Sequence, residues 1–244
     1  DLTLNCLCTA DAGTLTADAN PVCLDAGSAD ISATENAAPV VPAGYSVLYV
    51  LTSNPGLIIE QVAATPDFTV TEGGDYIIHT LVYNPATLDL SGVVLGTTSA
   101  LDVLPLITQG GGSICANLDA AGAPITVEAP DAGTLTADAS PVCLDAGSAD
   151  ISATENAAPV VPAGYSVLYV LTSNPGLIIE QVAATPDFTV TEGGDYIIHT
   201  LVYNPATLDL SVVVLGTTSA LDVLPSIVQG GGSICANLDA AGAP

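Results

Sequence analysis

The residues of this chain best suited to covalent chemistry are its six cysteines. Cys23 and Cys115 recur with the same spacing as Cys143 and Cys235. Six cysteines allow 15 pairings, so the choice rests on the repeat. We predict one disulfide per copy, Cys23 with Cys115 and Cys143 with Cys235. Closing a loop of about 90 residues would stabilise the fold by about 4–5 kcal/mol, and such bonds indicate an oxidising, extracellular compartment.

Cys6 and Cys8 stand apart, because the corresponding positions in the second copy are Thr126 and Glu128. A bond between Cys6 and Cys8 would close a small, strained ring. We predict instead that one of them forms a crosslink to another domain or another chain. A metal site is the alternative, although two sulfurs with no nearby histidine are few for a four-ligand zinc site.

His79 and His199 are the only histidines, and they occupy the same place in the two copies. In a strand over 76–83, alternate residues point to opposite faces, and both faces are largely apolar. We expect hydrogen-bonded structural histidines, with a metal ligand or catalytic base as the alternative. The outer apolar face needs cover from a long loop, a neighbouring domain or a neighbouring chain.

The 26 Asp and Glu residues are the other groups that could bind a ligand, since carboxylate oxygens suit calcium. Glu128 and Asp131, at the junction of the two copies, are the first candidates for a calcium site that would stiffen the joint. Other options are Asp25 with Asp30, and Asp89 with Asp102. Solvated carboxylates are the simpler interpretation, because no EF-hand loop is present. No other cofactor is expected.

The chain has no Lys or Arg, and this removes whole classes of function. Nucleic acids and anionic membrane surfaces are bound through basic side chains, so both are excluded as partners. Schiff-base lysines and arginine fingers are impossible for the same reason. Unpaired carboxylates repel one another, so we expect many of them to have raised pKa values. That would cost stability at high pH, and the cost would vanish as the pH falls through the raised pKa.

The elements that must position these residues are duplicated. Residues 131–244 repeat residues 11–124 with four substitutions, Asn20/Ser140, Gly92/Val212, Leu106/Ser226 and Thr108/Val228. We predict that 1–10 is a linker or the end of a preceding unit, and that 11–130 and 131–244 are two domains. So long a period indicates independently folding domains and not a solenoid. The second copy stops where the first continues, so we expect a window cut from a longer array.

Within one copy, short apolar segments alternate with turns rich in Gly, Pro and Asn, which favours β-structure. The expected strands are 13–18, 29–34, 45–52, 57–62, 68–71, 76–83, 113–117 and 125–127. Further short apolar runs lie in 88–104, and no segment shows a helical period. Many short strands with frequent turns predict an all-β chain of two tandem antiparallel sandwiches.

One motif narrows the kind of sandwich. Phe68 and Val70 are followed by Glu72-Gly-Gly-Asp-Tyr76, which resembles the corner tyrosine between strands E and F of immunoglobulin-like domains. We therefore predict immunoglobulin-like domains, although the disulfide and the tryptophan typical of antibody domains are absent.

Three longer strings are VPAGYSVLYVLT (41–52), YIIHTLVYNPATLDL (76–90) and QGGGSICANLD (109–119). They resemble tandem repeats of very large secreted surface proteins of gliding-type bacteria, which are exported across the outer membrane and act as adhesins or filaments. The resemblance covers both copies. It implies an extracellular location at the bacterial cell surface and a stalk or adhesive role, and it implies no catalytic residue and no particular ligand.

Two functions compete. The first is a structural unit of a surface fibre or adhesin stalk, made of rigid, disulfide-stapled beads that associate with neighbouring repeats. The second is a multivalent adhesive or carbohydrate-binding module with one site per repeat. An enzyme is disfavoured, since near-identical tandem sites are seldom needed. No stretch reads as a membrane span, and no signal peptide is visible, as expected of a mature product or an internal fragment.

Overall fold

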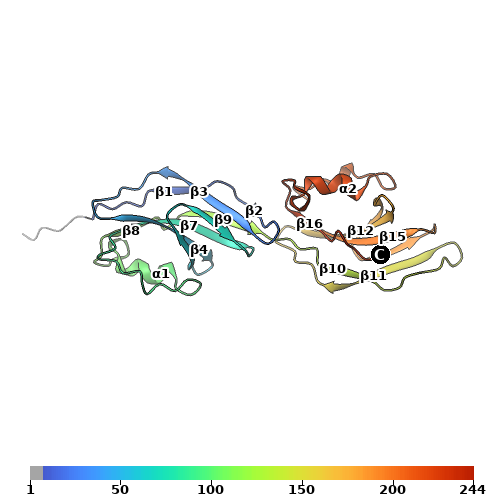
Figure 1. Cartoon of the computed structure of the whole chain (residues 1–244), viewed down its shortest axis with the longest axis horizontal. Coiled ribbons are helices and arrows are strands. Elements are labelled where there is room, and N and C mark those ends of the chain that lie inside the picture. The colour runs from blue at the N-terminus through green and yellow to red at the C-terminus, as the bar shows by residue number, and fades with distance from the viewer. Residues whose placement is uncertain (1–7) are drawn as a thin grey trace, which may run out of the picture. The chain divides into compact units, whose positions relative to one another are not determined.

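The computed structural model describes residues 8–244 and divides the chain into two compact units between Glu128 and Ala129 (Figure 1). Both units are mostly β, with antiparallel sheets, so the predicted all-β class is confirmed. None of the helices in the described part of the chain has the length and apolarity needed to cross a membrane.

The first unit contains two sheets. The three-stranded sheet has the order β1 (Thr14–Ala17), β3 (Ala29–Ala37), β6 (Asp67–Val70). The larger sheet has the order β2 (Val22–Cys23), β9 (Ala123–Glu128), β7 (Gly74–Tyr83), β4 (Ser46–Asn54), β5 (Ile58–Ala63), and β8 (Ala116–Leu118) also pairs with β7. The ladders are antiparallel apart from the short parallel pair of β2 and β9.

The two sheets pack face to face around the main core of the first unit. Alternation places Ala29, Ile31 and Ala33 of β3 inside, while Asp30 between them is exposed. Leu51 of β4 and Ile78 of β7 meet them from the other sheet and are fully buried. The unit is therefore a β-sandwich whose inner faces are set by period-two patterning.

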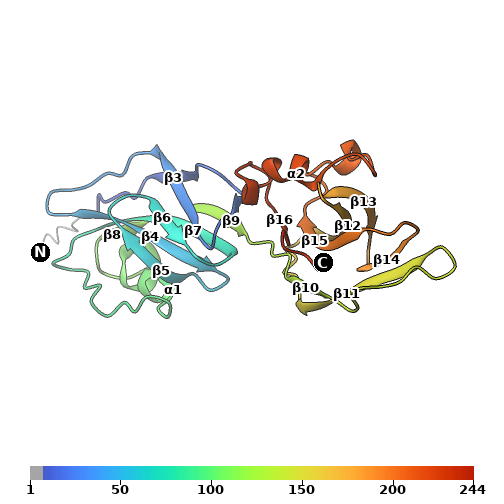
Figure 2. The ribbon, with the colours of Figure 1, turned by 45° about the vertical axis from the view of Figure 1, so that its right-hand side comes forward.

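A second core lies on the outer face of the larger sheet, under the cover segment (residues 84–115). Val50, Ile59 and Leu81 of the sheet pack there against Leu88 and Ile107 of the cover segment. Figures 1 and 2 show α1 (Ala100–Val103) on the opposite side of the larger sheet from β3. The expectation that the outer apolar face is covered is confirmed, and the cover is a long loop of the same unit.

The cover segment contains short helices, although its sequence shows no helical period. It contains α1 and two 3-10 turns, η1 (Leu104–Leu106) and η2 (Thr108–Gly110). A capping box starts α1, since Ser99 and Asp102 each accept from the other's backbone N–H. Such short turns leave no helical period in the sequence, because they last only about one turn each.

The second unit repeats this arrangement. One sheet has the order β10 (Thr134–Ala137), β11 (Ala149–Ala157), β14 (Asp187–Val190), and the other β13 (Ile178–Ala183), β12 (Ser166–Asn174), β15 (Asp195–Tyr203), β16 (Ala236–Leu238). Its cover segment (residues 204–235) carries α2 (Ala220–Val223) and the turns η3 (Leu210–Val212), η4 (Leu224–Ser226) and η5 (Val228–Gly230). An isolated bridge between Ile198 and Ala243 stands where β7 pairs with β9 in the first unit.

Candidate functional site

The disulfide pattern differs from the prediction. Cys115 is bonded to Cys8, with Cα atoms 5.2 Å apart, and not to Cys23. Cys23 pairs with Glu128 of β9, beside the end of β7 that begins at Gly74. Cys115 immediately precedes β8, which pairs with the opposite end of β7, at Tyr83. The ten-residue β7 separates the two ends by about 30 Å, far beyond the roughly 7 Å limit for a disulfide.

The predicted bond between Cys143 and Cys235 is also wrong. Cys143 is a free, exposed cysteine, whereas Cys23 and Cys235 are both disulfide-bonded. Of the two cysteines predicted to crosslink elsewhere, Cys8 instead closes a bond within its own unit. Cys6 lies outside the described residues. The disulfides indicate an oxidising environment.

His79 is buried between three elements of the first unit. Its Nδ1 donates to the carbonyl oxygen of Asp119 at 2.8 Å, and its Nε2 lies 3.0 Å from Thr52 Oγ1. A carbonyl can only accept, so Nδ1 carries the proton and Nε2 accepts from the hydroxyl. Burial lowers the pKa of His79, against the opposing effect of the Asp119 backbone and charge. The imidazole thus joins β4, β7 and the turn after β8.

His199 makes the same contacts in the second unit, at 2.9 Å to the carbonyl of Asp239 and 3.1 Å to Thr172. Burial lowers its pKa as well. Among residues 8–244 no group of three or more His, Cys, Asp or Glu side chains is arranged to hold a metal ion. Both histidines are hydrogen-bonded structural residues, as the sequence predicts.

Each residue predicted to bind calcium makes hydrogen bonds within the protein. Asp131 Oδ1 accepts from Gly133 N at 2.9 Å, and Glu128 pairs through its backbone with Cys23. Asp30 accepts from Thr69 at 2.6 Å, and Asp102 belongs to the capping box. Asp89 caps a turn, with Oδ1 2.9 Å from Ser91 N, and Asp25 forms a backbone bridge with Ser28. Calcium stays a prediction.

The expectation of raised carboxylate pKa values is wrong for four aspartates. Hydroxyl donors from Ser32 and Thr34, each 2.6 Å away, hold the pKa of Asp18 below its ordinary value. Asp138 has the same environment in the second unit. Hydrogen bonds from Ser91 and Ser211 lower the pKa of Asp89 and Asp209 in the same way. Serine and threonine thus supply part of the stabilisation that cations usually give.

Each unit also contains an apolar cavity between the larger sheet and the cover segment. In the first unit its volume is about 280 Å³. The strands contribute Leu48, Val50, Ile59, Val62, Leu81 and Leu118, and the cover segment contributes Leu90, Val93, Leu95, Ala100, Val103, Leu104 and Ile107. All of these side chains are aliphatic, so the cavity offers a ligand contact surface and no side-chain hydrogen bond.

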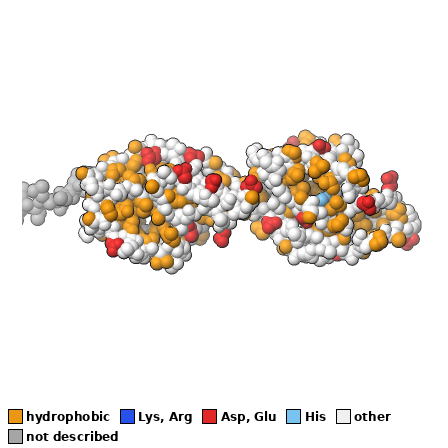
Figure 3. Space-filling model, in the orientation of Figure 1, with side chains coloured by type: hydrophobic (Ala, Val, Ile, Leu, Met, Phe, Trp, Pro, Cys, Tyr) orange, Lys and Arg blue, Asp and Glu red, His pale blue; other side chains and the backbone are white. Residues whose placement is uncertain are grey.

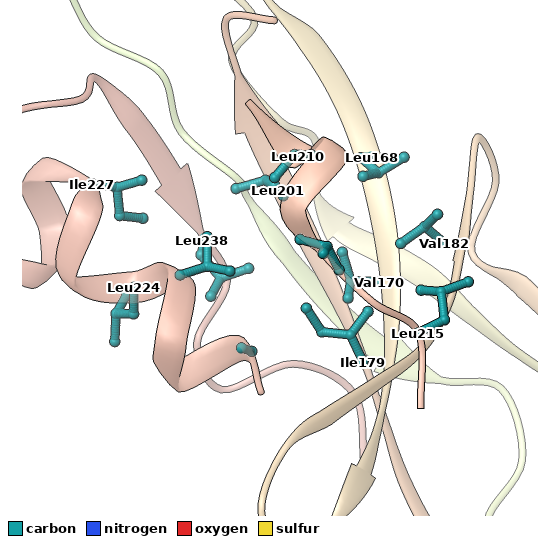
Figure 4. Close-up of a pocket in the computed structure, with 13 residues that line it drawn as sticks. Leu168, Val170, Ile179, Val182, Leu201, Leu210, Leu215, Leu224, Ile227 and Leu238 are labelled. Atoms are coloured by element: carbon teal, nitrogen blue, oxygen red, sulfur yellow. The ribbon is translucent and has the colours of Figure 1, made fainter. Parts of the chain in front are cut away.

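The cavity recurs in the second unit with a volume of about 260 Å³. Figure 4 shows Leu224 and Ile227 of the cover segment opposite Val170, Ile179 and other side chains of the strands. All 13 lining residues match those of the first unit one for one along the repeat.

The cover segment is fixed on two sides of the cavity. Toward β5, Gly96 N donates to Ile59 O at 2.8 Å and Ser99 Oγ donates to Gly56 O at 2.7 Å. Toward β8, the Gln109 amide donates to Leu118 O and accepts from Leu118 N, both at 2.9 Å. These bonds hold the roof above the sheet, so the cavity is a built feature of each unit.

Three of the four substitutions lie in the cover segment, yet none lines the cavity. Gly92/Val212 sits on the surface, where Val212 is 73% exposed. Leu106 is half exposed, and its counterpart Ser226 donates to Val223 O at 2.7 Å. Thr108 is exposed. The surface around the cavity has therefore changed between the copies while its wall has not.

The face drawn in Figure 3 carries carboxylates scattered among apolar and neutral side chains, and the chain has no Lys or Arg to pair with them.

The chain matches no family model and no curated protein.

The candidate site, the apolar cavity of each unit, is therefore defined by the structure alone. Sequence reasoning missed the cavity, because it assigned no structure to most of the cover segment. The available signal was the density of Leu and Val in 88–107, which exceeds what an exposed loop needs.

Proposed function

We propose that the chain is a structural repeat unit of an extracellular bacterial surface fibre or adhesin stalk. The observation that carries this proposal is the duplication of a complete folding unit, with its own pair of cores in each copy. Copies of a self-sufficient bead add length to an array without the need for a new fold. The resemblance of residues 41–52, 76–90 and 109–119 to repeats of secreted bacterial surface proteins supports an array at the cell surface.

We assign the beads to the immunoglobulin-like type of sandwich. The support is the hydroxyl of Tyr76, which donates to the carbonyl oxygen of Glu72 at 3.1 Å. Tyr196 makes the same bond to Glu192 at 3.2 Å. A tyrosine at the start of a strand that bonds to backbone a few residues upstream is the corner tyrosine of this type. The cover segment would then be an addition to the usual two layers.

The extracellular location rests on the chemistry of the cysteines together with the resemblance. Disulfides persist in oxidising compartments and are rare in the cytosol. The bond between Cys8 and Cys115 ties the beginning of the first unit to the segment before β8. In a fibre such a bond would keep most of the unit closed under tension, because force cannot extend the chain between the two joined residues.

Immunogold labelling of intact producing cells tests this function. Antibodies raised against the purified chain should label structures outside the cell at repeated intervals along a filament or stalk. A protease added to intact cells should remove the label, whereas an intracellular control protein should survive. Label confined to the cytoplasm would refute the proposal.

A second function, a binding module with one site per repeat, is favoured by the repeated cavity. The lining offers apolar contacts and no side-chain donor or acceptor. Carbohydrate recognition needs hydrogen bonds to hydroxyl groups, so this cavity does not support the carbohydrate-binding form of the proposal. An apolar ligand would suit it.

A further inference from the structure

We propose that each unit binds one uncharged hydrocarbon-like small molecule in the cavity between the larger sheet and the cover segment. This goes beyond a purely structural role, and it would hold whether or not the chain forms a fibre. The size of the cavity, the chemistry of its wall and mouth, and its presence in both units support this proposal.

The size suits a small apolar ligand. The volumes are about 280 Å³ and 260 Å³. An apolar cavity of about 150 Å³ stays dry and binds benzene, so each of these has room for a larger molecule, such as a bicyclic aromatic ring or a medium-length aliphatic chain. Dense packing leaves few such voids in a small domain, and here both units have one in the same place.

The wall selects against charge. All 13 lining residues are aliphatic, so a buried polar group of the ligand would lose its hydrogen bonds to water without replacement. An anionic head group would in addition find no Lys or Arg anywhere in the chain, and it would meet a net charge of −26. Fatty-acid carboxylates and phosphates are therefore disfavoured, and neutral hydrocarbons or aliphatic alcohols are favoured.

The mouth of the cavity is apolar as well. Val62 of β5 is 45% exposed and Leu95 of the cover segment is 51% exposed, although both line the cavity. Val182 and Leu215 repeat this in the second unit. Water is thus in contact with aliphatic side chains that a ligand would cover, and burying that area is the driving force for binding.

The same cavity is present in both units. The lining is identical in both copies, whereas substitutions have been accepted at Gly92, Leu106 and Thr108 of the same cover segment. The hydrogen bonds from Gly96 N and Ser99 Oγ to backbone carbonyls on the β5 side hold the roof in place above the sheet. A preformed cavity avoids the cost of ordering a loop on binding.

The test is a fluorescence titration of the full chain with N-phenyl-1-naphthylamine, a neutral probe that brightens in apolar surroundings. We expect saturable binding of two probes per chain, displacement by 1-decanol, and much weaker displacement by decanoate at neutral pH. Absence of saturable binding would overturn the proposal, and so would displacement by decanoate as effective as that by decanol.

Two kinds of variant localise the site. Ala100→Leu with Ala220→Leu fills both cavities from the cover segments, and we expect a loss of affinity of at least about tenfold. Ala220→Leu alone should halve the number of sites. Val62→Gln with Val182→Gln changes only exposed mouth residues, so the fold should survive, and we expect binding to weaken several-fold. Thermal unfolding followed by circular dichroism checks that each variant is folded.

The matched control is Leu101→Gln with Leu221→Gln. Both leucines are 55% exposed on α1 and α2 and neither lines a cavity, so binding should be unchanged. If this control loses binding as much as the mouth variant does, the probe binds to general apolar surface and the proposal is wrong. Dilution of the chain gives a further check. If probe binding disappears together with a dimer-to-monomer transition, the cavity is the contact site for a second copy of the chain, and the small-molecule proposal is wrong.

Discussion

Cys8 and Cys115 are joined by a disulfide across 107 residues of sequence. Nearby, the backbone N–H of Ala12 donates to Asn117 Oδ1 at 2.7 Å, so the segment that follows Cys8 runs beside the start of β8. The bond therefore closes nearly the whole first unit into one covalent ring.

Replacing both cysteines, Cys8→Ser with Cys115→Ser, should lower the free energy of unfolding of the first unit by about 4–5 kcal/mol, because the unfolded chain regains the entropy of an open loop. Denaturant unfolding followed by tyrosine fluorescence should show one transition shifted to lower denaturant and the other unchanged. Equal shifts of both transitions would contradict the assignment of this bond to the first unit.

Cys143 should be the thiol that reacts first among the described cysteines, because it is free and exposed. We expect a neutral maleimide to label it in the unreduced chain, and Cys143→Ser to remove that label. Peptides for mass spectrometry have to come from cleavage at Asp or Glu, since trypsin has no site. Label at Cys115 without prior reduction would contradict the disulfide pattern.

Protonation of the two histidines should destabilise both units. Burial holds the pKa of His79 and His199 below 6.5, so the unfolded state binds protons more readily. The free energy of unfolding should therefore fall as the pH falls below about 6.5. Ordinary aspartates titrate near 4, and the lowered pKa of Asp18 lies further down. The interval from pH 6.5 to 5 is therefore the one in which to compare the chain with a variant that lacks both histidines.

The variant His79→Gln with His199→Gln should be less stable at pH 7 and should show a flatter pH dependence between pH 6.5 and 5. Urea unfolding at four pH values measures this slope. The four aspartates with lowered pKa values also make the free energy of unfolding fall with falling pH, but at lower pH. Their contribution to stability is lost as the pH falls through their folded pKa. An unchanged slope in the variant would show that the buried imidazoles do not control acid sensitivity.

Gly122 should not tolerate a side chain. Its φ is +56°, and a Cβ atom there would lie 2.6 Å from Ile78 O and 2.8 Å from His79 Nδ1. Gly122→Ala should therefore destabilise the first unit by more than about 1 kcal/mol and disturb the bond of His79 to Asp119. Gly111→Ala is the matched control, with φ +90° but nothing within 4 Å of the added Cβ. Thermal unfolding compares the two, and equal losses would assign the effect to backbone strain alone.

The sequence predicts the strands well where alternation or a long apolar run is present. Residues 29–34 and 76–83 lie within β3 and β7, and 125–127 lies within β9. The structural role of His79 was also predictable, since a lone histidine on an apolar strand needs buried partners. These features depend on local pattern, which a sequence displays directly.

Other features depend on contacts between distant segments. The repeat suggested that Cys115 pairs within its copy, but only the arrangement of β2, β7 and β8 shows that Cys23 lies at the wrong end of the sheet. The cavity likewise needs the cover segment to be placed over β4 and β5. The lowered pKa of Asp18 depends on hydroxyl groups from the neighbouring strand β3.

Single-molecule force spectroscopy of the reduced chain, pulled from its two ends, measures whether each repeat is a self-contained bead able to bear load. We predict two separate unfolding events of similar force, each with a gain in contour length of the order of 350–400 Å, as expected for about 115 extended residues. In the oxidised chain the bond between Cys8 and Cys115 should remove most of the gain of the first unit. A single event that releases both repeats of the reduced chain, or extension without a force peak, would show that the repeats are not separate load-bearing beads.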